Sequence, residues 1–250
     1  MTVTEPEATP RGTAQEAPQP AHHDQHTHRD VTGGWLRPAV FGAMDGLVSN
    51  LALMTGVAGG DVSRHTIVIT GLAGLAAGAF SMAAGEYTSV ASQRELVQAE
   101  LEVERTELRR HPDDELAELA ALYESRGVEP ELALRVAEQL SADPEQALEI
   151  HAREELGVDP DDLPSPTVAA VSSFGSFALG ALLPVLPYLL GATQLWPALL
   201  LALVGLFTCG ALVARVTARS WWYSGLRQLL LGGAAAALTY GLGALFGAAV

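Results

Sequence analysis

The chain has 250 residues, of which 49% are hydrophobic, and its formal net charge is −15. This acidity argues against nucleic acid as a partner, because proteins meet the phosphate backbone with basic surfaces, and a single cysteine excludes an intrachain disulfide. Charge and apolarity are segregated, since residues 94–162 hold 21 of the 29 acidic residues and the remainder is apolar and nearly neutral. The segregation predicts a membrane protein with one acidic domain outside the bilayer.

Residues 1–34 are rich in Pro, Ala, Gln, Thr and His and contain no apolar run. They lack the apolar core of a signal peptide, so their composition predicts a disordered tail. Within the tail, "HHDQHTH" at residues 22–28 places four imidazoles in seven residues. Such a segment either binds a transition metal loosely or is simply a solvated tail that is rich in His.

Two membrane spans are expected directly after the tail, because a bilayer core requires about 20 apolar residues per helix. The first apolar stretch carries a single charge, Asp45, and the second has none before Glu86. The spans are predicted near residues 38–60 and 66–91, within a transmembrane domain of residues 35–91.

Asp45 lies where a carboxylate is expensive to bury, at about 2.5–3.5 kcal/mol on membrane-insertion scales, which predicts a functional residue. The alternative is a structural hydrogen bond to a neighbouring helix. Gly42 and Gly46 flank it as a GxxxG pair, which predicts that two helices approach closely. Such an approach would allow two copies of Asp45 to meet across a two-fold axis. Met82 and Glu86, in the second span, are further candidates for an ion path, although Met82 also fits simple packing.

Residues 92–163 form an acidic insert with a helical pattern. Its first part, "SQRELVQAELEVERTELRRH", contains no Gly or Pro, so one long helix is predicted to leave the membrane from the second span. "PDDELAELAALYESRG" predicts a second helix ending at Gly127, and "EPELALRVAEQL" and "PEQALEIHAREELG" predict two more. Their apolar positions recur at helical spacing, which predicts a small helical bundle.

The insert also places possible metal ligands at helical spacings. They are Glu100, Glu104 and Glu107 on the first helix, Glu115 and Glu118 on the second, and His151 and Glu155 on the last. Like charges on one helix face repel, unless the face is solvated or a cation neutralises it. Carboxylates with one imidazole suit Fe(II), Mn(II) or Zn(II). An ordinary solvated acidic face is the alternative.

Three further spans are predicted in the domain of residues 164–250, near residues 167–190, 195–216 and 226–249. The stretch "GATQLWP" supplies the turn between the first two of them. The whole pattern predicts an all-α membrane protein with five transmembrane helices and a helical bundle inserted between the second and third.

The arginines predict the orientation, because cytoplasmic loops are rich in basic residues. Arg29 and Arg37 precede the first span, and Arg215, Arg219 and Arg227 lie in the connection between the last two spans. The N-terminus and the acidic insert are therefore predicted to face the cytoplasm and the C-terminus the outside. The chain would be a multi-pass cell-membrane protein.

At these residues the sequence resembles the vacuolar iron transporters and their bacterial relatives. The resemblance rests on "FGAMDGLVSNLALMTGVAGG", "GAFSMAAGEYTSVASQRE", "HAREELG" and "GALLPVLPYLL". It implies a homodimer with a metal path between the subunits, along the first spans. It also implies export of Fe(II), and of other divalent metals, from the cytoplasm in exchange for protons, with no permanently bound cofactor.

The resemblance assigns roles to individual residues. The family's pore Asp and Met correspond to Asp45 and Met82. Its metal-binding glutamates and a final Met–Glu pair correspond to Glu104, Glu107, Glu115, Glu118, His151 and Glu155. His151 departs from the pattern, because it replaces a soft sulfur with a borderline nitrogen.

The resulting prediction is a metal/proton antiporter in which the insert collects metal for a path near Asp45. The alternative is a membrane-anchored metal buffer or sensor that binds metal without moving it. An enzyme is not expected, because the sequence shows no Ser/His/Asp or Cys/His arrangement and no phosphate-binding motif.

Overall fold

The computed structural model describes residues 34–217 and 219–247, which form helices and no strand. In chain order the helices are α1 (Leu36–Ala58), α2 (Arg64–Arg110), α3 (Pro112–Ser125), α4 (Pro130–Leu140), α5 (Pro144–Glu154), α6 (Pro166–Leu189), α7 (Trp196–Thr217) and α8 (Trp221–Gly247). The predicted all-helical class is confirmed for these residues. The predicted tail and its His-rich segment at residues 22–28 lie outside them.

Five of the described helices, α1, α2, α6, α7 and α8, are long and apolar enough to cross a membrane. Side-chain caps fix where two of them begin. Ser63 accepts a hydrogen bond from the Thr66 N–H at 3.2 Å before α2, and Ser165 accepts one from the Val168 N–H at 3.4 Å before α6. Such caps satisfy amide groups that lack a partner inside the helix.

Helix α2 runs unbroken for 47 residues, which is about 70 Å at the rise of an α-helix. The prediction that one long helix continues from the second span is therefore confirmed. The helix ends at Arg110, with His111 as its cap, because Pro112 has no N–H to continue the hydrogen-bond ladder. The proline instead occupies the first turn of α3, where no such N–H is needed.

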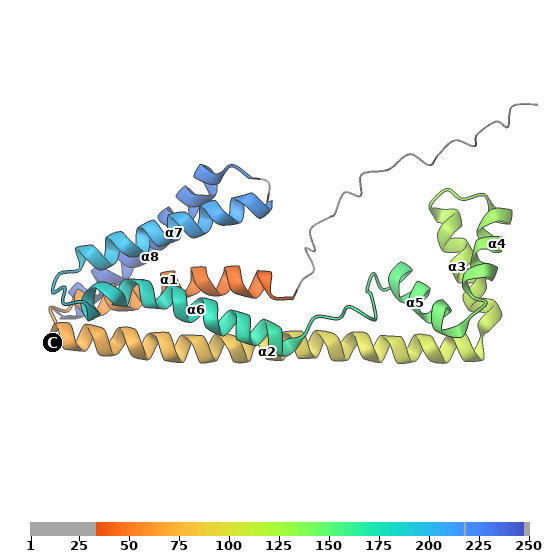
Figure 1. The fold of residues 1–250 in the computed structure, drawn as a ribbon, viewed down its shortest axis with the longest axis horizontal. Helices are drawn as coiled ribbons and strands as arrows, with labels where there is room; N and C mark the ends of the chain where they lie inside the picture. The colour runs from red at the N-terminus through yellow and green to blue at the C-terminus, as the bar shows by residue number, and fades with distance from the viewer. Residues whose placement is uncertain (1–33, 218, 248–250) are drawn as a thin grey trace, which may run out of the picture. The chain divides into compact units, whose positions relative to one another are not determined.

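Helix α1 packs against α2, α6, α7 and α8 (Figure 1). Its buried Leu47 and Leu51 form a core with residues of α7 and α8. Asn50 is only 2% exposed, and its side-chain amide donates to the Gly71 carbonyl at 3.1 Å and the Ala181 carbonyl at 2.7 Å. One polar side chain thus joins α1 to both α2 and α6.

The GxxxG pair of α1 packs within the chain. A Cβ on Gly42 would collide with the Ser176 side chain, and one on Gly46 would lie 2.9 Å from the Ala181 nitrogen. Both glycines therefore allow the backbones of α1 and α6 to approach each other. The predicted close approach of two helices is confirmed, and the helix that meets α1 at this pair is α6 of the same chain.

Helices α1, α6 and α8 run in the same direction. Ser172, near the start of α6, donates to the Trp35 carbonyl just before α1 at 2.8 Å. Along α8, Gly232 lies against Val48, and Gly243 lies against Gly56. The connection between α7 and α8 is therefore at the end of the helices where α1 and α6 begin, which is also the end from which α2 extends into the insert.

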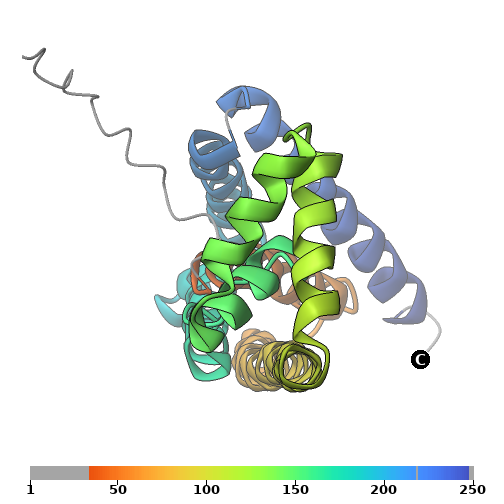
Figure 2. The same cartoon turned by 90° about the vertical axis from the view of Figure 1, so that its right-hand side faces the viewer.

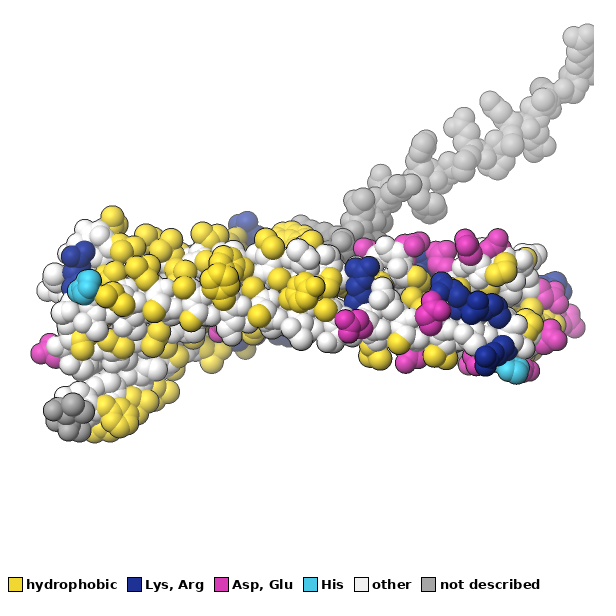
Figure 3. Space-filling view, turned by 90° about the horizontal axis from the view of Figure 1, so that it is seen from below, with side chains coloured by type: hydrophobic (Ala, Val, Ile, Leu, Met, Phe, Trp, Pro, Cys, Tyr) yellow, Lys and Arg dark blue, Asp and Glu magenta, His cyan; other side chains and the backbone are white. Residues whose placement is uncertain are grey.

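Helices α3 and α5 pack against α2, and α4 packs against α3 and α5; Figure 2 shows α3 and α4 side by side. Leu119, Ala120 and Ala137 form their small core, with Ile150 of α5 against it. Figure 3 shows hydrophobic side chains over the apolar helices and acidic and basic ones over the insert. This division of the surface agrees with the segregation of charge along the sequence.

Candidate metal centre

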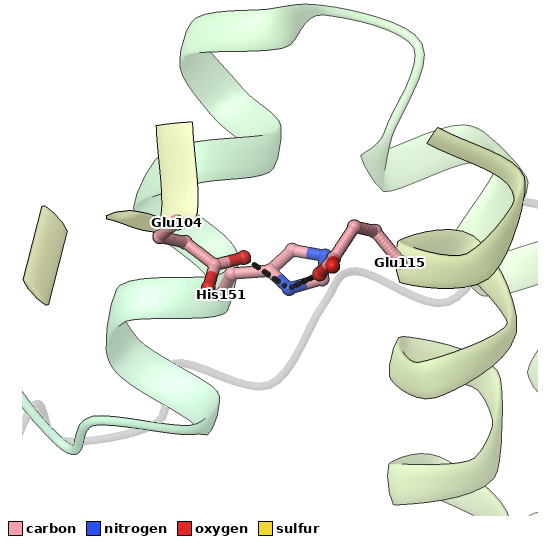
Figure 4. Close-up of side chains that lie close together, drawn as sticks. All are labelled: Glu104, Glu115 and His151. Carbon is pink, nitrogen blue, oxygen red and sulfur yellow. Dashed lines mark ion pairs between the residues drawn. The ribbon is translucent and has the colours of Figure 1, made fainter. Parts of the chain in front are cut away.

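Three helices of the insert bring ligand-type side chains together. Glu104 comes from α2, Glu115 from the first turn of α3, and His151 from the last turn of α5 (Figure 4). Glu155 directly follows α5. The turn at Pro112 redirects the chain, and the start of α3 lies close to the end of α2 (Figure 1). An acidic residue in a first turn and a histidine in a last turn both agree with the helix dipole.

The carboxylates converge on one nitrogen. His151 Nδ1 lies 2.8 Å from Glu155 Oε1, 3.0 Å from Glu104 Oε1 and 3.7 Å from Glu115 Oε2. One ring nitrogen carries at most one hydrogen, so it cannot donate to three oxygens. Single ligand atoms from Glu104, Glu115 and His151 all lie within 4.8 Å of one another.

This cluster is buried and poor in hydrogen bonds. The side chain of His151 is fully buried, and those of the three glutamates are 12–20% exposed. Within the described part of the chain, neither ring nitrogen of His151 makes a hydrogen bond, and neither does Glu104 Oε1 or Glu155 Oε1. Buried polar atoms are normally paired, so four unpaired ones in a single cluster indicate a site for a ligand.

Burial raises the pKa of Glu104, Glu115 and Glu155 above that of an ordinary glutamate. Repulsion between carboxylates raises the pKa further, since Glu155 acts on Glu104, and Glu104 acts on Glu115. The negative forms of these groups are therefore unfavourable without a cation.

A divalent cation would satisfy the cluster. It would neutralise the carboxylates and use the unpaired oxygens and nitrogen as ligands. First-row metals bind carboxylate oxygen and imidazole nitrogen at about 2.0–2.2 Å, so a small inward movement of the side chains completes the coordination. The mixed oxygen and nitrogen donors suit Fe(II), Mn(II), Co(II) or Zn(II) better than Cu(I).

The other predicted ligands of the insert lie around this cluster. Glu118 is exposed, but its charge contributes to the raised pKa of Glu115 and Glu155. Glu107 lies near the imidazole of His111, with 3.9 Å between Oε2 and Nε2. Glu100 is exposed on α2. The structure thus brings together four of the seven predicted ligands of the insert.

The predicted residues of the apolar helices lie apart from this cluster. Asp45 is on the exposed face of α1, and its carboxylate makes no hydrogen bond or ion pair within residues 34–217 and 219–247. Met82 packs against the core of Ala79 and Phe177. Glu86 is half-buried at the next turn of α2.

Asn50, which joins α1, α2 and α6, was not singled out by the sequence analysis. The sequence could have indicated Asn50, because it is an amide side chain in an otherwise apolar span. Such side chains form hydrogen bonds between membrane helices.

The fold and the cluster define a class, a helical membrane protein with a carboxylate and imidazole site outside its apolar helices. The chain belongs to the VIT family, which it matches over residues 36–244. The members of this family are transporters and not enzymes.

Individual relatives agree with this assignment. The chain is 40% identical over 199 residues to a vacuolar iron transporter of Acanthamoeba castellanii, covering 75% of this chain and 72% of that protein. It is 36% identical over 218 residues to vacuolar iron transporter homolog 1 of Oryza sativa subsp. japonica, covering 85% and 74%. Vacuolar iron transporter 1 of the same plant is 29% identical over 232 residues, covering 90% and 92%.

Proposed function

We propose that this protein exports Fe(II) from the cytoplasm across a membrane in exchange for protons, and that it acts as a homodimer. Mn(II), Co(II) and Zn(II) are further substrates that suit the same ligands. In this proposal the chain crosses the bilayer five times, with the N-terminus and the insert in the cytoplasm and the C-terminus outside. The names of the relatives support iron as the cargo.

The observation that carries the proposal is the convergence of Glu104, Glu115 and Glu155 on the fully buried His151. A merely solvated acidic face would keep its carboxylates apart and in water. This cluster instead keeps unpaired ligand atoms in a buried place. It is a site on which metal can be collected before transport.

The exposed face of α1 supports both an ion path and a dimer. Phe41, Asp45, Ser49 and Leu53 follow one another at four-residue intervals and are exposed, so they form one stripe along the helix. A lone carboxylate facing lipid is unfavourable. A second copy of the chain packed on this stripe would shield Asp45 from lipid and place Asp45 of the second copy nearby. Gly42 and Gly46 would not take part in this contact, because they pack against α6.

Two facing carboxylates explain exchange with protons. They repel each other until a proton or a cation neutralises the pair. A metal ion arriving from the cytoplasm would displace protons from Asp45, and protons entering from the other side would release the metal. Met82 and Glu86 would line the path on α2.

The test is metal flux into proteoliposomes, with the internal pH recorded. Flux of Fe(II) accompanied by opposite proton movement is expected for the parent chain. Asp45→Asn should abolish the flux while the dimer still assembles. Asp61→Asn is the matched control, because it makes the same change outside the helices, at a φ of 53° that Asn tolerates.

Each outcome separates the proposal from its rivals. Persistent metal flux in Asp45→Asn would show that the carboxylate of Asp45 is not needed on the ion path. Metal flux without proton movement would rule out the antiport mechanism. Metal binding by the insert without any flux would instead establish a membrane-anchored buffer or sensor.

A further inference from the structure

A cavity of about 540 Å³ lies beside the second half of α7, where the chain connects to the start of α8. Phe207, Leu212 and Trp221 give it apolar walls, and Arg215 and Arg219 also line it. The rings of Phe207 and Trp221 meet edge to face, with 6.1 Å between their centroids. The volume falls in the range of pockets that bind small ligands, about 300–1,000 Å³.

The lining of the cavity combines apolar side chains with basic ones. The sequence from residue 211 to residue 227 contains three arginines and three aromatic residues but no Asp or Glu, so this segment carries a net positive charge. Helix α8 begins at Trp221, and the start of a helix adds partial positive charge. The cavity therefore suits a ligand with an anionic head and an apolar tail.

The position of the cavity near the predicted membrane surface indicates which kind of ligand can reach it. Trp221, Trp222 and Tyr223 beside it are 49–60% exposed, as is typical of aromatic residues at the surface of a bilayer. The connection lies at the end of the apolar helices from which α2 continues into the acidic insert. A soluble anion near that end meets the repulsion of the insert, whereas a lipid is already held in the membrane plane.

We propose that this cavity binds one anionic phospholipid. Its phosphate would lie at Arg215 and Arg219, and one acyl chain would lie along Phe207 and Leu212. Basic pockets between membrane helices on the cytoplasmic side bind anionic headgroups in general, and each basic residue near the surface contributes about 1 kcal/mol. Two arginines therefore predict a clear preference for phosphatidylglycerol over phosphatidylcholine.

The test is lipid binding to the full chain in neutral detergent, measured by native mass spectrometry. The probes are phosphatidylglycerol, phosphatidylcholine with the same acyl chains, and inorganic phosphate. Either Arg215→Gln or Arg219→Gln should weaken binding of phosphatidylglycerol about 5-fold, and the double variant about 30-fold. Arg227→Gln is the matched control, because Arg227 lies on α8 outside the lining of the cavity and should leave binding unchanged.

A second variant tests the apolar part without changing charge. Ala211→Phe places a large side chain into the lining of the cavity, and it should weaken both lipids while both arginines remain. The proposal is overturned if the double arginine variant keeps the preference of the parent for phosphatidylglycerol. It is also overturned if inorganic phosphate displaces that lipid, since the site would then bind a free anion.

Discussion

Replacing Glu104 by Gln should stabilise the insert when no metal is bound. Glu104 Oε1 and Glu155 Oε1 lie 3.0 and 2.8 Å from the same nitrogen of His151. The two oxygens are thus at most about 5.8 Å apart, and at an effective dielectric constant of about 20 their charges repel by about 3 kcal/mol. Solvent screening and the opposing charge on His151 reduce this term, so the expected gain is about 1–2 kcal/mol.

Hydrogen exchange of the amides of α3–α5, in the full chain in detergent, measures this local stability directly. At neutral pH, Glu104→Gln should slow exchange about 5- to 30-fold relative to the parent chain. The folded-state pKa of Glu104 is raised, so its contribution favours folding in acid and is lost as the pH rises through the raised value. The stability advantage of the variant should therefore decrease as the pH falls toward 4.5, the ordinary pKa of glutamate.

Glu102→Gln is the matched control, because Glu102 is exposed on the same helix and pairs only with Arg105 among the described residues. It should leave exchange in α3–α5 unchanged. Addition of Co(II) should reverse the order, protecting the parent more than Glu104→Gln, because the variant lacks one ligand. Faster or equal exchange in metal-free Glu104→Gln at neutral pH would refute the reasoning that the carboxylates repel one another.

Gly46→Ala should lower the thermal unfolding midpoint in detergent, because its Cβ would collide with the backbone of α6 and overpacking costs about 1–3 kcal/mol. Gly175→Ala, with open space around it, should not lower it, and equal losses in both would contradict the packing argument. Asn50→Leu should reduce stability by about 1 kcal/mol, because two backbone carbonyls lose a donor; an unchanged midpoint would count against that bridge. Glu118→Gln should move the acid-side loss of Co(II) binding to lower pH, because the charge of Glu118 helps to raise the pKa of Glu115. Titration calorimetry from neutral to mildly acidic pH would measure this shift. An unchanged pH dependence of Co(II) binding would show that Glu118 does not affect the cluster.

The sequence predicted the helices well because their signals are local. The absence of Gly and Pro from residue 86 to residue 111 is enough to predict that α2 continues beyond its apolar part. Pro112, Pro130, Pro144 and Pro166 each stand in the first turn of a helix. Such prolines indicate helix starts whatever the tertiary contacts are.

The cluster was predictable only in part. The spacing of His151 and Glu155 places them on one helix face, and this can be read from the sequence. The approach of Glu104 and Glu115 to His151 depends on how α2, α3 and α5 pack together. No local sequence pattern specifies that packing. The GxxxG pair shows the same limit, because it indicates that a helix approaches Gly42 and Gly46 but not that the partner is α6.

The unbroken helix α2 also fixes how far the cluster lies from the apolar region. Eighteen residues separate Glu86 from Glu104, which is about 27 Å along the axis. No ion can bridge that span while bound to both ends, so under the proposed function the insert of one chain would act as a reservoir of metal. One ion in a sphere of that radius corresponds to an effective concentration of about 20 mM. Under the proposed function, losing the cluster should raise the metal concentration for half-maximal flux and leave the maximal rate intact.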